Sequence, residues 1–187
     1  MKRSGFTIIE LVVVIVLLGI LAAVGLPRLF SNFDSASAAR LEGIAGAMEA
    51  AAGLAKAQWI AQDKPNAVTV DDGTLINLDP VTGFPVDSLN QANDTIRNMG
   101  IRECERVFRV MTKTSETVTR SGNANTLRQN DFYVRRINGA PDPDTCVYYQ
   151  ISEALIAARP NNAGVDPRYP SLVYTPEDGR VAVANPP

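Results

Sequence analysis

The chain has 187 residues and a formal net charge of −2, which comes from 18 basic and 20 acidic side chains. This balance argues against a nucleic-acid-binding protein, because such proteins normally carry a basic patch or stripe. The sequence contains no histidine, so it lacks the usual general base near neutral pH and the commonest metal ligand.

The first predicted element is an apolar run of 21 residues from Phe6 to Leu26, in which Glu10 is the only charged residue. As a helix it would be roughly 30 Å long, which is the thickness of the hydrocarbon core of a bilayer. A charged side chain inside such a helix costs on the order of 2.5–3.5 kcal/mol or more unless a partner satisfies it. The sequence therefore predicts a membrane helix with an acid that needs a partner.

Three interpretations of this run are open. A secretory signal peptide would use the basic start and the small residues Ala23–Gly25 as its cleavage site. A single-pass anchor would keep its basic end in the cytoplasm. Cleavage between Gly5 and Phe6 would retain the helix and create an amine on Phe6, four residues from Glu10. Of the three, this last interpretation supplies a partner for Glu10.

The leader Met1–Gly5, followed by Phe6-Thr7-Ile8-Ile9-Glu10 and a long apolar helix, closely resembles that of type IV prepilins. The resemblance implies cleavage after Gly5 by a membrane prepilin peptidase, which also methylates the new Phe6 amine. It implies that Glu10 guides the packing of subunits into a filament. Loss of the leader removes two basic residues, so the formal side-chain charge becomes −4 (16 basic minus 20 acidic).

Beyond the apolar run, an amphipathic pattern with spacings of three and four continues the helix to about Gln62. Pro27 predicts a kink or a local break, and Gly19 and Gly25 loosen the same region. In type IV pilins a matching proline adjoins a stretch that can unwind in the filament, and the resemblance implies the same here. A helix of this length suits a structural spine better than a small globule.

The polar remainder predicts a globular head. Four β-rich runs in the last third predict a roughly four-stranded antiparallel sheet packed on the second half of the spine, hence an α+β fold. A weaker hairpin, a short helix and two loops are also expected. The ranges are 132–137, 146–151, 172–175 and 181–184 for the sheet, 67–71 and 75–78 for the hairpin, 94–111 for the helix, and 82–87 and 115–130 for the loops.

Cys104 and Cys146 are the only cysteines. Because the inferred compartment lies beyond the inner membrane, we expect them to form a disulfide, with two reduced buried cysteines as the alternative. Cys146 lies farther from the C-terminus than the second cysteine of many type IV pilins. No sequence motif for catalysis, a cofactor or a metal is found, so no enzyme activity, cofactor or metal site is expected.

The sequence thus predicts a leader (1–5), a transmembrane and filament-core helix (6–29), its amphipathic continuation (30–62) and a head (63–187). By resemblance the chain is the major subunit of a type IV pilus used for adhesion, surface colonisation or motility. Its expected partners are copies of itself, the prepilin peptidase and the inner-membrane assembly machinery. It would lie in the inner membrane before assembly and in a surface filament afterwards.

Two other functions remain open: a pseudopilin of type II secretion and a membrane-anchored periplasmic binding protein. The stretches "TGFPVD" and "SLVYTPEDGRVAV" resemble those in pilins of the mannose-sensitive haemagglutinin group.

Overall fold

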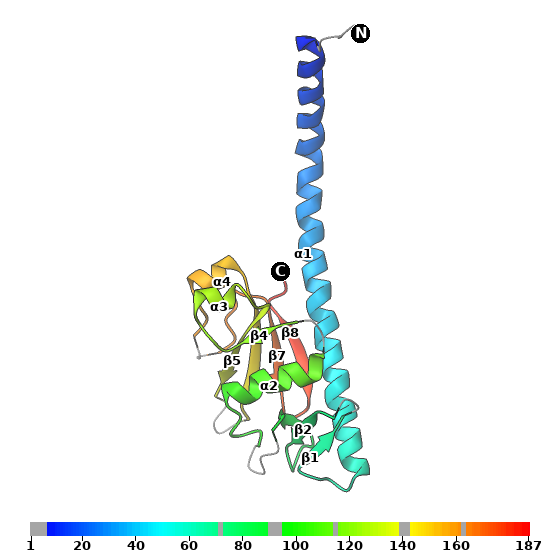
Figure 1. Cartoon of the computed structure of the whole chain (residues 1–187), viewed down its shortest axis with the longest axis vertical. Coiled ribbons are helices and arrows are strands. Elements are labelled where there is room, and N and C mark those ends of the chain that lie inside the picture. Colours follow the sequence, from blue (N-terminus) through cyan, green and yellow to red (C-terminus); the bar gives the residue numbers. More distant parts are fainter. Residues whose placement is uncertain (1–6, 71–72, 90–94, 114–115, 139–142, 162–163) are drawn as a thin grey trace, which may run out of the picture. The chain divides into compact units, whose positions relative to one another are not determined.

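The computed structural model describes residues 7–70, 73–89, 95–113, 116–138, 143–161 and 164–187, without the side chains of residues 26–34. The chain divides into two compact units, Met1–Ala39 and Arg40–Pro187. Helix α1 (Ile8–Ala61) contributes to both units (Figure 1). Residues 71, 94 and 115, at which three of the expected elements begin or end, lie outside the described residues.

In the first unit, α1 presents an exposed apolar surface. The segment Ile8–Gly25 has a mean hydropathy of 3.0, and none of it is buried. By length and composition it could cross a membrane. The helix continues without interruption through Gly19, Gly25 and Pro27. Unwinding at these residues was predicted for an assembled filament, and it stays a prediction.

The C-terminal end of α1 is formed by two residues with left-handed backbone. Asp63 and Lys64 have φ values of 62° and 59°, and the Lys64 amide donates to the Trp59 carbonyl at 2.8 Å. This pattern is a helix-ending motif in which a left-handed residue lets the chain satisfy the last carbonyls. The helix therefore ends at Ala61, one residue before the predicted end.

In the second unit, α1 buries one face against the head. Its core residues recur at spacings of three and four, so they lie on one side of the helix. They are Leu41, Ile44, Ala45, Met48 and Ala52. On a neighbouring side of α1, Glu49 accepts a hydrogen bond from the Val181 amide of edge strand β8 (Arg180–Ala184) at 2.8 Å. This bond caps part of an edge that would otherwise be open to pairing with another chain.

A small antiparallel sheet has the order β1–β2–β3, with β1 at Ala67–Thr69, β2 at Leu75–Leu78 and β3 at Pro85–Asp87. The expected hairpin of β1 and β2 is confirmed. The interpretation of 82–87 as a loop was wrong for its second half. Two distant side chains hold β3 in place: Tyr174 donates to the Pro85 carbonyl at 2.8 Å, and Arg106 pairs with Asp87.

The main sheet has the order β4–β5–β6–β7–β8. Strands β5 (Phe132–Ile137), β6 (Thr145–Gln150), β7 (Ser171–Thr175) and β8 are antiparallel neighbours, as predicted. A fifth strand, β4 (Val118–Thr119), runs parallel to β5 and corrects the expected number of four.

A carboxylate explains why β4 lies beside β5. Asp131, just before β5, accepts from the Thr117 amide at 2.9 Å and from the Thr117 hydroxyl at 2.7 Å. Arg40 of α1 pairs with Asp131 at 3.3 Å and also with Glu116. Burial opposes the charged form of Asp131, but the hydrogen bonds from Thr117 and the Arg40 charge lower its pKa overall. The spine is thus linked to the start of two strands.

Both faces of the main sheet are covered, so alternate residues of its strands enter two cores. Helix α2 (Ile101–Thr112) lies across the strands in Figure 1 and shares the first core with α1. Helices α3 (Ala124–Leu127) and α4 (Glu153–Ala157) contribute to the second core and were not predicted. The buried sheet residues of the two cores are Val118, Phe132, Val134, Cys146, Tyr148, Leu172, Tyr174 and Val181 on the first face and Tyr133, Val147 and Tyr149 on the second.

The ion pair between Arg106 and Asp87 gives a test of the head. The Asp87 side chain is fully buried and the Arg106 side chain is 24% exposed. Removing one partner of a buried pair leaves an unpaired charge, so we expect Arg106→Met to lower the free energy of unfolding by about 3 kcal/mol. The measurement is denaturant unfolding of the full chain in detergent, followed by the fluorescence of Trp59, which is 4% exposed.

A matched control is Arg109→Met, because Arg109 is 61% exposed and pairs with Glu105 at 2.7 Å one helical turn away. That variant is expected to cost only about 0.5 kcal/mol. Equal losses in the two variants would contradict the assigned role of Arg106.

Candidate processing and assembly site

The expected cleavage site, Gly5 and Phe6, lies outside the described residues. The described part of the site begins at Thr7, immediately before α1. Three hydrogen bonds join Thr7 and Glu10. Oε2 of Glu10 accepts from the Thr7 amide at 2.9 Å and from the Thr7 hydroxyl at 2.8 Å. The Glu10 amide donates to the Thr7 hydroxyl oxygen at 3.3 Å.

This arrangement is a capping box, in which a Ser or Thr before the helix and a Glu three residues later satisfy each other's backbone amides. Such a box occupies two donors that a helix start leaves without an intrahelical partner. Glu10 therefore has a partner within its own chain, in addition to the Phe6 amine expected from the sequence. The pattern Thr7-x-x-Glu10 before an apolar run is visible in the sequence and was overlooked.

Capping does not use all of the acceptor capacity of Glu10. Both hydrogen bonds from Thr7 end on Oε2, whereas a carboxylate offers about four lone pairs on two oxygens. Around it, Ile9, Val13 and Val14 line a shallow hollow of about 290 Å³ with Glu10. The carboxylate is thus held at the start of the helix, at the edge of an apolar surface.

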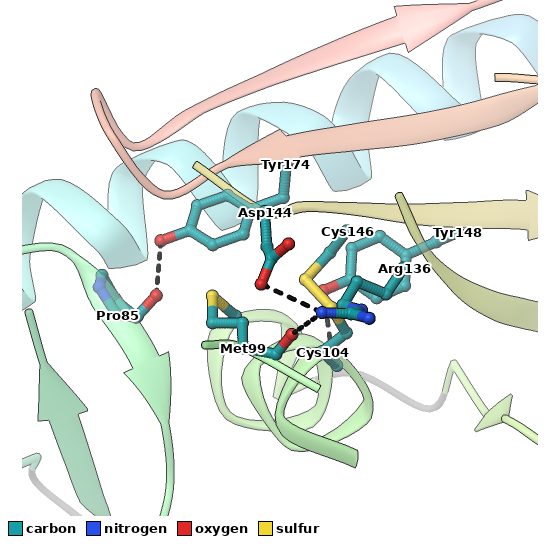
Figure 2. The surroundings of a disulfide bond; sticks show 8 residues. All are labelled: Pro85, Met99, Cys104, Arg136, Asp144, Cys146, Tyr148 and Tyr174. Atoms are coloured by element: carbon teal, nitrogen blue, oxygen red, sulfur yellow. Dashed lines mark hydrogen bonds and ion pairs between the residues drawn. A yellow bond between two sulfur atoms is a disulfide. The ribbon is translucent and has the colours of Figure 1, made fainter. Parts of the chain in front are cut away.

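The predicted bond between Cys104 and Cys146 is confirmed. It joins α2 to β6, with a Cα–Cα distance of 5.5 Å, and both cysteines are fully buried (Figure 2). The hydroxyl of Tyr148 donates to the Cys104 carbonyl at 2.8 Å. Burial raises the pKa of Tyr148, so this hydroxyl stays a neutral donor. The disulfide is therefore a structural cross-link in the core.

A second link beside the disulfide ties the start of α2 to the sheet. Arg136 of β5 donates to the Asp144 carboxylate at 3.2 Å and to the Met99 carbonyl at 3.4 Å (Figure 2). The Asp144 amide donates to the Ile96 carbonyl at 2.8 Å. These contacts and the disulfide hold the same two parts of the head together.

Within the described ranges, no three His, Cys, Asp or Glu side chains lie close enough together to hold a metal ion. The polar groups described above cap a helix, pair charges or join strands.

An apolar N-terminal helix followed by a head with an antiparallel sheet is the α+β arrangement of type IV pilins. The family model described as the prokaryotic N-terminal methylation motif matches residues 1–26. The chain is also similar to the type IV narrow pilus major component PilA5 of Thermus thermophilus. Identity is 41% over 58 residues, which are 31% of this chain and 50% of that protein.

The chain thus spans about half the length of this curated relative. A search of the solved structures finds no match. The methylation motif and the similarity to PilA5 support a type IV pilin. The finer resemblance to the mannose-sensitive haemagglutinin group stays a prediction.

The disulfide gives a second test. The bond closes a loop between residues 42 positions apart, so on the loop-entropy model its loss should lower the free energy of unfolding by roughly 4 kcal/mol. We expect this loss in the double variant Cys104→Ala, Cys146→Ala, measured by denaturant unfolding of the full chain. The unaltered chain under reducing conditions serves as the control and should lose a similar amount. A change below about 1 kcal/mol in both would contradict a structural role for the bond.

Proposed function

We propose that the chain is a non-enzymatic structural subunit that polymerises with copies of itself into a type IV pilus. The observation that carries the proposal is the apolar segment Ile8–Gly25, none of which is buried and all of which lies within the stretch matched by the methylation motif. A large exposed apolar surface marks a membrane or protein contact. Lipid would cover this surface before assembly, and the same segments of other copies would cover it afterwards.

The proposed maturation step is cleavage between Gly5 and Phe6 by a prepilin peptidase, with methylation of the new Phe6 amine. The subunit would then wait in the inner membrane for the assembly machinery and end in a surface filament. We further propose that it is the major subunit, and that the filament serves adhesion, surface colonisation or motility. The similarity to a pilus component named as major supports this choice.

The proposed role of Glu10 in assembly is to pair with the Phe6 amine of a neighbouring copy. Replacing lipid by other apolar helices gives little hydrophobic preference for one register, because both surroundings are apolar. A charge pair in those surroundings does distinguish registers, since either charge left alone is costly. The capping box with Thr7 would keep the carboxylate at the start of the helix, where the amine of a neighbour staggered by about one turn could reach it.

Two substitutions separate the charge of Glu10 from its capping role. Glu10→Gln keeps a side chain that can complete a capping box but removes the charge. Thr7→Val removes the cap but keeps the charge. We expect Glu10→Gln to reduce the yield of sheared surface filaments at least tenfold, in line with the kcal-scale cost of an unpaired charge in an apolar interior. We expect Thr7→Val to change that yield less than twofold. The measurement is the amount of chain in the sheared fraction relative to the membrane fraction.

Immunoblots of both fractions control for expression and membrane insertion. If Thr7→Val abolished filaments while Glu10→Gln assembled normally, Glu10 would act through capping and not through its charge. If the unaltered chain formed no surface filaments, the proposed function itself would fail. A type II secretion pseudopilin would likewise form no surface filaments.

A further inference from the structure

An apolar groove opens in the second unit between the last turns of α1, the small sheet and the end of α2. Its volume is about 530 Å³. Leu54, which contributes to its wall, is 72% exposed. Most of the lining side chains are apolar, with Gln58 and Lys113 as polar members; representative residues are Leu54, Gln58, Ala61, Ile76, Val110 and Lys113. An exposed hollow with this lining is typical of a surface that meets another molecule.

An apolar side chain of the same unit stands out from the surface. Val81 is 85% exposed, the largest value among the large hydrophobic residues described. It lies in the turn between β2 and β3, and Pro80 beside it is also exposed. We refer to Pro80, Val81 and Thr82 as the Val81 turn.

The Val81 turn is held from beneath by a buried carboxylate. Asp79 is 2% exposed. Its Oδ1 accepts from the Val81 amide at 2.9 Å and from the Thr82 amide at 2.8 Å. Its Oδ2 accepts from the Ile96 amide at 3.0 Å. A surface that is already ordered loses little conformational entropy on binding, which favours its use as a contact.

A close contact fixes the other side of the turn. Gly83 has a φ of 72°, and a Cβ there would lie 2.5 Å from the Trp59 ring. Glycine is therefore required both by the left-handed backbone and by the indole of α1. The turn presents Val81 outward because its own base is packed against the spine.

The groove and the Val81 turn lie on opposite flanks of α1. The ammonium of Lys56 sits 4.0 Å from the centre of the Phe84 ring, next to the turn. The groove is lined by Leu54 and Gln58, each two residues from Lys56 and hence rotated by about 200° around the helix. A surface on one flank that fits a different surface on the other flank produces head-to-tail contacts, which build open helical chains.

Charged residues near the Val81 turn and the groove also favour contact between these two surfaces. The Thr82 hydroxyl donates to the Pro176 carbonyl at 3.2 Å, which joins the Val81 turn to the hairpin turn that carries Glu177 and Asp178. Both carboxylates lie at exposed positions. Arg180 pairs with Asp178 at 4.0 Å. The groove includes the cationic Lys113 in its lining. The exposed Glu177 and the groove-lining Lys113 carry opposite charges, which suits a contact between two copies.

We propose that the Val81 turn of one copy of this chain docks into the apolar groove of a second copy. The contact rests on the proposed function, because it supplies the heads with a repeating contact in a filament. This contact determines which surfaces of neighbouring heads meet, whereas the apolar helix does not.

The test is a cysteine cross-link in filaments of the full chain. The double variant Val81→Cys, Leu54→Cys is oxidised in sheared filaments and run on a non-reducing gel. Each subunit would join the next through the two new cysteines, so we expect a ladder of dimers, trimers and larger species that disappears on reduction. The matched control is Val81→Cys with Ala47→Cys. Ala47 is exposed on the same side of α1 as Leu54 but about 10 Å along the helix, and it should give no ladder.

Intact filaments without a ladder, or with equal ladders from both pairs, would overturn the docking proposal and leave the proposed function standing. Absence of filaments from the unaltered chain would overturn both. If the cysteine pair itself prevented assembly, Val81→Asp would decide. It is expected to lower filament yield at least about tenfold, because it places a charge in an apolar contact. The control Leu89→Asp should not lower the filament yield, because Leu89 is 46% exposed and lies outside the turn and the groove lining. Equal filament yields from Val81→Asp and Leu89→Asp would overturn the docking proposal.

Discussion

The apolar surface of α1 between Ile8 and Gly25 has no buried residue, and the assembly of the protein depends on how that surface is covered. Water is a poor solvent for that surface, so lipid or other apolar helices must cover it. Both environments are apolar, so moving the helix from lipid into a bundle favours no particular arrangement of the subunits. That arrangement has to be set by polar groups at the helix start and by the heads, where specific contacts can form in water.

Glu10 illustrates how one side chain can serve two requirements. Within the single chain it completes a capping box with Thr7, which stabilises the first turn of α1. Its position at the start of an apolar surface also makes it suited to meet an amine of another copy. The head has to present a stable surface. A buried disulfide and the Arg106–Asp87 pair hold its parts together, so it can form that surface by itself.

Much of this fold follows from local sequence. The run at 132–137 has the bounds predicted for it, because β-rich residues end at clear turn signals there. Strands β3 and β4 could not be predicted, since each depends on side chains far away in the sequence: Tyr174 and Arg106 for β3, and Asp131 for β4. Helix α3 starts at a capping asparagine within the polar stretch 115–130, which was interpreted as a loop. Helix α4 starts at the capping Ser152, and no element was predicted there. At the candidate site, Glu10 was recognised, but its local partner Thr7 was overlooked although the spacing was visible.

We propose that the mature subunit retains the apolar helix and that this helix lies inside a surface filament. The most direct measurement is the intact mass and N-terminal peptide mass of the chain from a sheared surface fraction of the native cells. We expect a chain that begins at N-methylated Phe6 and keeps all of α1. A chain that begins after Gly25 would contradict it, because the surface proposed to drive assembly would have been removed.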